Sequence, residues 1–188
     1  MNKPRRIWLT GASSGMGAQM AEELLKSGAQ LALSARTLAP LHALAERFPG
    51  QVLLVPGDLT EREQVREIGQ QIAQAWGALD TVILNAGTCE YVDVGHFDAA
   101  LIERVVRTNL LANSYCLETA LPLLRAGLRP HLVGVVSSVT FWPLPHAHGL
   151  IGVGRKLGRK QLENARQPRR RPRPLQPCPR GKSAPAGL

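Results

Sequence analysis

Five short, mostly apolar runs, each separated from the next by a segment of helical character, most strongly constrain the fold of this chain. The runs do not alternate between apolar and polar residues, so both faces of each expected strand should be buried. Strands of this kind belong to parallel sheets, where right-handed crossovers place helices on both faces. We therefore predict an α/β fold with a Rossmann-type, doubly wound parallel sheet in three layers. The expected strands are residues 7–9, 30–35, 52–55, 81–84 and 132–136.

The segments between these runs have the spacing of amphipathic helices. Within residues 61–76, apolar side chains recur at intervals of three or four residues and mark one buried face. These side chains are Val65, Ile68, Ile72 and Trp76. The expected helices are residues 18–28, 38–48, 61–76 and 98–125.

A turn with three glycines, Gly11, Gly15 and Gly17, follows the first expected strand and precedes a helix. At such a helix start, the unpaired backbone N–H groups and the positive end of the helix dipole favour a bound phosphate. The spacing is Gly-x-x-x-Gly-x-Gly, which differs from the Gly-x-Gly-x-x-Gly of the commonest dinucleotide-binding turn. Taken alone, the turn predicts a phosphate site, and a plain turn without a ligand is the alternative.

Polar residues stand at the end of each expected strand. They are Thr10, Arg36, Asp58, Asn85 and Ser138. Because the carboxyl ends of parallel strands lie at one edge of a sheet, these residues should surround a single crevice. We therefore expect the ligand of this protein to bind at that edge.

Five elements of the sequence resemble the short-chain dehydrogenase/reductase family of NAD(P)-dependent oxidoreductases. They are residues 10–17 (TGASSGMG), 57–59 (GDL), 85–87 (NAG), 108–109 (TN) and 136–138 (VSS). Each element also has an ordinary structural interpretation, such as a helix cap for Asp58 or a polar helix position for Asn109. Together, however, the five elements occur in the order and spacing of the family, which favours membership of it. The resemblance covers residues 4–149.

The resemblance implies a cofactor site. The residues expected around the pyrophosphate are Gly11, Ser13, Ser14, Gly15, Met16 and Gly17. Asp58 would accept a hydrogen bond from the adenine amino group, beside the backbone of Leu59. The residues expected along the adenosine ribose are Asn85, Ala86 and Gly87.

The residue after the second expected strand bears on the choice of cofactor. An acid there would bond to the ribose 2′-OH and repel a 2′-phosphate. This chain has Arg36, whose guanidinium can pair with a phosphate. We therefore expect NADP(H) rather than NAD(H), and a solvated charge at a strand end is the alternative for Arg36.

The resemblance assigns catalytic roles to two residues of this chain. Ser138 would bond to the substrate carbonyl, and Asn109 would order a proton-relay water. The family's acid/base Tyr and its Lys would stand at positions that hold Ile151 and Arg155 here. Neither residue can exchange a proton near neutral pH. We therefore expect impaired NADP(H)-dependent alcohol or carbonyl oxidoreduction, and the alternative is a cofactor-binding remnant without activity.

The family pattern ends near residue 150. Residues 155–188 hold 6 Pro and 11 of the 23 Lys and Arg, but no Val, Ile, Phe, Tyr, Trp or Met. This composition buries too little apolar surface to offset the entropy of ordering. We therefore predict an NAD(P)-binding Rossmann domain over residues 1–154, a C-terminally truncated sheet and a disordered basic tail. A shifted reading frame would produce such a change, which we treat as a hypothesis.

The net charge of +9 reflects the tail, because residues 1–154 hold 12 basic and 13 acidic groups. A nucleic-acid-binding tail is a third hypothesis, although the tail lacks aromatic side chains for base stacking. Three scattered cysteines indicate neither a disulfide framework nor a zinc site, and no segment has transmembrane length. We expect a cytoplasmic protein that acts on a small alcohol or carbonyl compound. The resemblance implies association through the long helix over residues 98–125 and through a further helix that the sequence after residue 150 cannot supply. Oligomerisation should therefore be compromised.

Overall fold

The core of the molecule is a sheet of five parallel strands in the order β3-β2-β1-β4-β5. The computed structural model describes residues 3–91 and 96–137. The strands are β1 (Arg6–Thr10), β2 (Gln30–Ser34), β3 (Val52–Leu54), β4 (Thr81–Leu84) and β5 (His131–Gly134). All five expected strands are present. The strand order reverses between β1 and β4, which is where doubly wound sheets bind their ligands.

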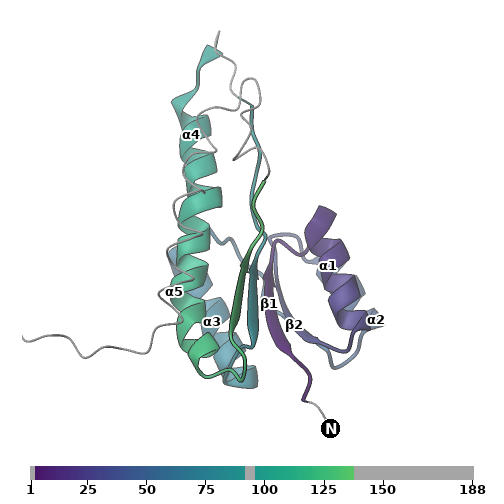
Figure 1. Cartoon of the computed structure of the whole chain (residues 1–188). Coiled ribbons are helices and arrows are strands. Elements are labelled where there is room, and N and C mark those ends of the chain that lie inside the picture. The colour runs from purple at the N-terminus through teal and green to yellow at the C-terminus, as the bar shows by residue number, and fades with distance from the viewer. Residues whose placement is uncertain (1–2, 92–95, 138–188) are drawn as a thin grey trace, which may run out of the picture.

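Helices cover both faces of this sheet (Figure 1). On one face lie α1 (Gly15–Lys26) and α2 (Ala39–Arg47), and on the other lie α3 (Arg62–Trp76) and α5 (Ala112–Arg125). Alternate residues of β1 enter two separate hydrophobic clusters. Ile7 and Leu9 pack in the cluster of α1 and α2, whereas Trp8 packs in that of α3 and α5. The predicted three-layer α/β architecture is confirmed.

The long expected helix is divided into three parts. α4 (Ala99–Val106) begins after Asp98, whose side chain caps it by accepting a hydrogen bond from the N–H of Ala100. A π-helical turn, η2 (Arg107–Leu111), separates α4 from α5, and the N–H of Ala112 donates to the carbonyl of Arg107 five residues earlier. Turns of this kind are rare and occur frequently at functional sites.

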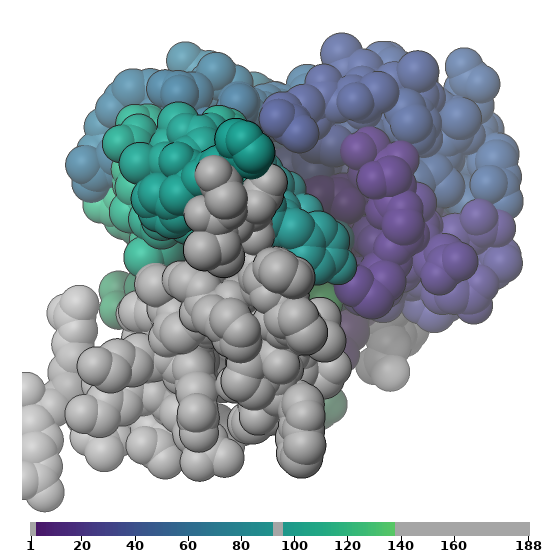
Figure 2. All heavy atoms as spheres, turned by 90° about the horizontal axis from the view of Figure 1, so that it is seen from above, coloured from purple at the N-terminus to yellow at the C-terminus, as the bar shows by residue number. Residues whose placement is uncertain are grey.

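The central strand β1 sets the register of the sheet, and every one of its residues is buried. It pairs with β2 from Arg6 opposite Gln30 to Thr10 opposite Ser34. On its other side it pairs with β4, with Leu9 opposite Ile83. The carboxyl ends of β1, β2 and β4 therefore lie side by side. Figure 2 looks onto this edge, with the purple and blue residues of the first βα units beside the green and teal residues of α4 and α5.

Three expectations lie outside the described residues. They are the domain boundary at residue 154, the tail over residues 155–188 and the truncation of the sheet beyond residue 137. Within the described part of the chain, β5 is the outermost strand on its side of the sheet, and three of its four residues are exposed.

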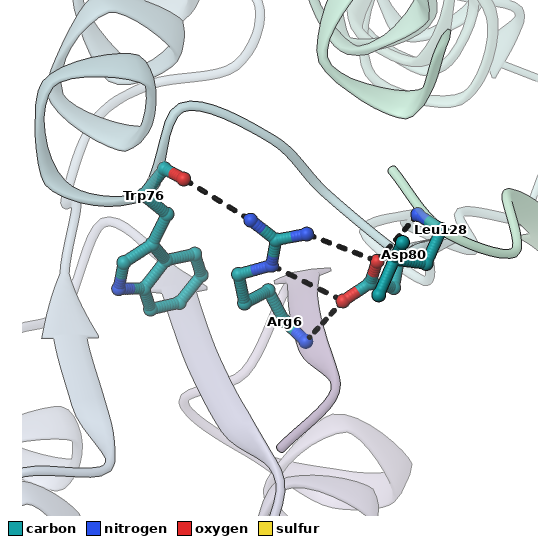
Figure 3. Close-up of polar contacts among 4 residues, drawn as sticks. All are labelled: Arg6, Trp76, Asp80 and Leu128. Atoms are coloured by element: carbon teal, nitrogen blue, oxygen red, sulfur yellow. Dashed lines mark hydrogen bonds and ion pairs between the residues drawn. The ribbon is translucent and has the colours of Figure 1, made fainter. Parts of the chain in front are cut away.

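A buried ion pair joins the start of β1 to the loop before β4 (Figure 3). Arg6 Nη2 lies 3.1 Å from Asp80 Oδ1, while the backbone N and Nε of Arg6 donate to Asp80 Oδ2 at 3.0 and 3.1 Å. Arg6 Nη1 also donates to the carbonyl of Trp76 at 3.1 Å, and the N–H of Leu128 donates to Asp80 Oδ1 at 3.1 Å. One ion pair thus connects the starts of β1 and β4, the end of α3 and the loop before β5.

The environment of Asp80 keeps its carboxylate ionised. Burial raises the pKa of this group, but the hydrogen bonds from the Arg6 side chain and from the N–H groups of Arg6 and Leu128 outweigh burial. Together they lower the pKa from 3.8 to about 2. The Asp80 carboxylate therefore binds a proton more weakly in the folded state than in the unfolded chain.

We expect Asp80→Asn to lower the free energy of unfolding by about 3–5 kcal/mol at pH 7, because it leaves the Arg6 guanidinium buried without a counter-ion. Because the folded pKa is depressed, the contribution of this carboxylate is complete above the unfolded pKa and is lost as the pH falls toward 2. The lowered pKa of Asp80 corresponds to a contribution of about 2 kcal/mol to the free energy of unfolding, which is lost as the pH falls through the folded pKa. Urea unfolding followed by circular dichroism at several pH values measures both effects.

The variant provides its own control for the pH dependence. The amide that replaces the Asp80 carboxylate would not titrate, so the unfolding free energy of the variant should decline less between pH 4 and pH 2 than that of the original chain. Equal declines in the two proteins would contradict the role assigned to the ion pair.

Candidate nucleotide-binding site

The glycine turn lies between the end of β1 and the start of α1 and is bonded to the end of β2. The N–H groups of Gly11 and Ala12 donate to the carbonyl of Ser34 at 2.8 and 3.2 Å. Gly11 and Gly15 have φ angles of 68° and 52°, in the left-handed region that favours glycine. The sequence of this turn is therefore dictated in part by its backbone conformation.

Two of the glycines also lie too close to other backbone atoms to carry a side chain. A Cβ atom on Gly17 would lie 2.0 Å from the carbonyl oxygen of Gly11. A Cβ atom on Gly11 would lie 2.9 Å from the Cα atom of Ala86, in the loop after β4. The turn therefore packs directly against this loop at the switch point of the sheet.

The start of α1 differs from the prediction, since the helix begins at Gly15 and not at Ala18. Ser14 is the N-cap residue, but its side chain makes no capping hydrogen bond, and the first turn contains no acidic residue. Ser14, Gly15 and Met16 are exposed, and Ser13 is half-buried. The helix thus presents an uncapped, exposed N-terminus without a neutralising acid, which suits an anionic group.

Thr10 and Asn85 connect the glycine turn to β4. Thr10 Oγ1 accepts from the N–H groups of Asn85 and Ala86 at 3.0 Å each, and it donates to the carbonyl of Ile83 at 3.3 Å. Asn85 Nδ2 donates to the carbonyls of Thr10 and Gly11 at 3.1 and 3.2 Å. The amide nitrogen of Asn85 is thus directed at the turn, while Ala86 is half-buried and Gly87 is exposed.

Asp58 lies in the loop after β3, and one oxygen of its carboxylate shapes this loop. Asp58 Oδ1 accepts from Thr60 N at 2.9 Å and from Thr60 Oγ1 at 2.8 Å. The bond from the Thr60 N–H is the largest influence on the pKa of Asp58, which is lowered although burial acts to raise it, and the charge of Arg36 lowers it further. Arg36 is exposed, whereas the Leu59 side chain belongs to the core cluster of α3 and α5.

Asn109 lies in η2 and binds the same loop after β4 from the other side. Its Oδ1 accepts from Thr88 N at 2.8 Å, and its Nδ2 donates to the carbonyl of Thr88 at 2.8 Å. A Cβ atom on Gly87 would lie 3.2 Å from Asn109 Oδ1. Asn109 therefore clamps the main chain of the loop with both ends of its side-chain amide.

The structure brings together the predicted residues of the glycine turn, the loop after β4 and η2. Arg36 and Asp58 lie at the ends of the adjoining strands β2 and β3 and interact electrostatically. Ser138, Ile151 and Arg155 lie outside the described residues. The sequence predicts Thr10 at the crevice, but it reveals neither the bonds of Thr10 to the loop after β4 nor those of Asn109 to Thr88. No local spacing signals such contacts, because they span 75 and 21 residues.

Other classes of site find no support in the part of the chain that the structure describes. Over residues 3–91 and 96–137, no three His, Cys, Asp or Glu side chains are grouped to hold a metal ion. Among these residues there is also no helix with the length and apolar character needed to cross a lipid bilayer.

Known proteins share both the sequence pattern and the fold. The chain matches the family model of short chain dehydrogenases over residues 5–149. It is 34% identical over 140 residues to an uncharacterised oxidoreductase of Mycobacterium tuberculosis, a match that covers 72% of this chain and 55% of that protein.

Two solved structures are similar to most of this chain. An alcohol dehydrogenase from the archaeon Thermococcus sibiricus, complexed with 5-hydroxy-NADP, has a TM-score of 0.77 at 27% identity, over 86% of this chain and 72% of that chain. L-sorbose reductase from Gluconobacter frateurii, complexed with NADPH and L-sorbose, has a TM-score of 0.74 at 25% identity, over 82% of this chain and 60% of that chain.

The chain spans about half the length of the curated relatives it matches. The matched part contains all five strands, the glycine turn and the loops at the carboxyl edge of the sheet. The family match and the parallel sheet thus agree with the resemblance seen in the sequence, and the protein belongs to the short-chain dehydrogenase family of oxidoreductases.

Proposed function

We propose that this protein binds NADP(H) at the carboxyl edge of its sheet. The observation that carries the proposal is the uncapped N-terminus of α1, packed behind a glycine turn that leaves no room for side chains at Gly11 and Gly17. Main-chain N–H groups there can approach a pyrophosphate closely. The complexes of the two similar solved structures with NADPH and 5-hydroxy-NADP support this assignment.

We assign a different group of residues to each part of the cofactor. The backbone of residues 11–17 would hold the pyrophosphate, and the half of the Asp58 carboxylate not bonded to Thr60 would accept from the adenine amino group. Ala86 and Gly87 would lie along the adenosine ribose. The guanidinium of Arg36 would pair with the 2′-phosphate, which is the basis for preferring NADP(H) over NAD(H).

The proposed reaction is hydride transfer between the nicotinamide and a small alcohol or carbonyl compound, which is the chemistry that the cofactor supplies. Ser138 would hold the carbonyl oxygen of the substrate. Asn109 would order the proton-relay water through its backbone carbonyl, because both ends of its side-chain amide bind Thr88. This carbonyl also accepts from Asn113 Nδ2, and its second lone pair would serve the water. Ile151 and Arg155 cannot exchange the proton that this reaction requires. We therefore infer cofactor binding with impaired or no turnover.

Arg36→Ala should weaken the binding of NADPH about 10- to 100-fold, because a hydrogen bond to a charged group contributes about 1.5–3 kcal/mol. The affinity for NADH should stay nearly unchanged, since this cofactor has no 2′-phosphate. Titration of the cofactor fluorescence measures both affinities.

Arg66→Ala is the matched control, because Arg66 is an exposed arginine of α3 that pairs with Glu63 on its own helix. It should leave both affinities unchanged. Equal losses of NADPH and NADH affinity in Arg36→Ala would contradict the phosphate contact.

Gly17→Ala should abolish the binding of both cofactors, because the new Cβ atom would meet the Gly11 carbonyl at 2.0 Å and displace the turn. Gly134→Ala is the control, since a Cβ atom there meets nothing within 4 Å. Fluorescence titration gives the affinities, and thermal unfolding shows whether each variant is folded. Undiminished NADPH binding by folded Gly17→Ala protein would exclude this turn as the pyrophosphate site.

The protein should bind NADPH but reduce NADP⁺ with a generic secondary alcohol far more slowly than the ~10 s⁻¹ typical of enzymes. The physical reason is the lack of a proton-transferring side chain at residues 151 and 155. The increase in absorbance of NADPH measures turnover. A rate of a few per second would contradict the inferred loss of activity, and a failure to bind NADPH would contradict the proposed function itself.

A further inference from the structure

Two consecutive side chains in the first turn of α5 bond back to the π-helical turn η2. Asn113 Nδ2 donates to the carbonyl of Asn109 at 2.9 Å, and Ser114 Oγ donates to the carbonyl of Leu110 at 2.9 Å. Both bonds reach four residues back, just where the five-residue hydrogen bond from Ala112 to Arg107 interrupts the α-helical pattern. The side chains therefore brace the segment in which the main-chain pattern is irregular.

Only the first of these bonds leads on toward the candidate cofactor site. The Asn109 carbonyl accepts from Asn113, and the Asn109 side chain forms two hydrogen bonds to the main chain of Thr88. Thr88 directly follows the loop residues Ala86 and Gly87. Leu110, by contrast, has an apolar side chain that cannot form such a link. A continuous series of hydrogen bonds thus runs from Asn113 to the loop after β4.

We propose that Asn113 is a positioning residue for the NADP(H) site, and this inference rests on the proposed function. Its amide fixes the peptide group that follows Asn109, and so fixes the direction in which the Asn109 side chain meets Thr88. Without this bond, the irregular turn would hold Asn109 less firmly, and the loop that would line the ribose would open more often. All three residues are half-buried, so water competes with these bonds only in part.

Hydrogen exchange at the Thr88 amide tests the positioning directly, because this N–H donates to Asn109 Oδ1. In Asn113→Leu, which has a similar size but no donor, we expect exchange of this amide to be about 10-fold faster. We also expect NADPH to bind about 2- to 10-fold more weakly. Asn113→Asp removes the donor with little change of shape and serves if the leucine variant does not fold.

Two further variants separate positioning from a general loosening of the helix. Asn113→Ser should restore slow exchange and NADPH affinity, since a serine hydroxyl can also donate to the carbonyl four residues earlier. Ser114→Ala removes the neighbouring bond and should leave the Thr88 amide unchanged. Equal acceleration in Ser114→Ala and Asn113→Leu, or unchanged exchange in Asn113→Leu and Asn113→Asp, would overturn the inference.

Hydrogen exchange and NADPH affinity together distinguish a failure of the positioning role from a failure of the proposed function. If the original chain fails to bind NADPH, the proposed function is wrong, and the role of Asn113 at a cofactor site is wrong with it. If the original chain binds NADPH and the exchange and affinity of Asn113→Leu match it, the proposed function stands and the positioning role alone is wrong.

Discussion

The ion pair between Arg6 and Asp80 is the contact on which the arrangement of the two halves of the sheet depends. Removing a carboxylate and a guanidinium from water costs several kcal/mol for each group, so such a pair persists only when every bond is well formed. Here Asp80 accepts from the side chain and backbone of Arg6 and from the backbone of Leu128. The pair lies at the amino edge of the sheet, opposite the glycine turn, so it takes up none of the carboxyl edge at which we propose that the cofactor binds.

The carboxyl edge is built by two groups of residues with different tasks. Thr10, Asn85 and Asn109 use their side-chain hydrogen bonds to hold the loops themselves. By contrast, the uncapped start of α1 and the guanidinium of Arg36 are exposed. A site whose loops are fixed before the ligand arrives loses less entropy on binding. The polar residues that look like ligand contacts in the sequence are therefore in large part the ones that hold the loops in place.

The sequence predicts the fold well because apolar runs and helical spacing are local signals. All five strands and the helix boundaries near residues 39–47 and 62–76 agree with the structure to within a few residues. The start of α1 was misplaced because glycine is a poor helix former. Here the φ of 52° at Gly15 and the close approach of Gly17 to the Gly11 carbonyl require glycine in the first turn of the helix. The π-helical turn was missed because Val105, Ala112 and Cys116 are all buried, as they would be on one face of a regular α-helix. A single wider turn therefore leaves the apolar pattern almost intact. Contacts such as that of Arg6 with Asp80 have no local signal at all.

The place of β1 in the sheet has a consequence for how the chain folds. β1 is synthesised before the other four strands and can pair with β2 early, but its other neighbour, β4, begins only at Thr81. The contact between Arg6 and Asp80 spans 74 residues, so it can form only late, after most of the described chain has been made. Until then one edge of β1 is unpaired, and the side chain of Trp8, which is fully buried in the folded protein, still lacks its packing against α5. Contacts this distant in sequence slow folding, and the partly folded chain exposes the unpaired edge of β1 until β4 pairs with it.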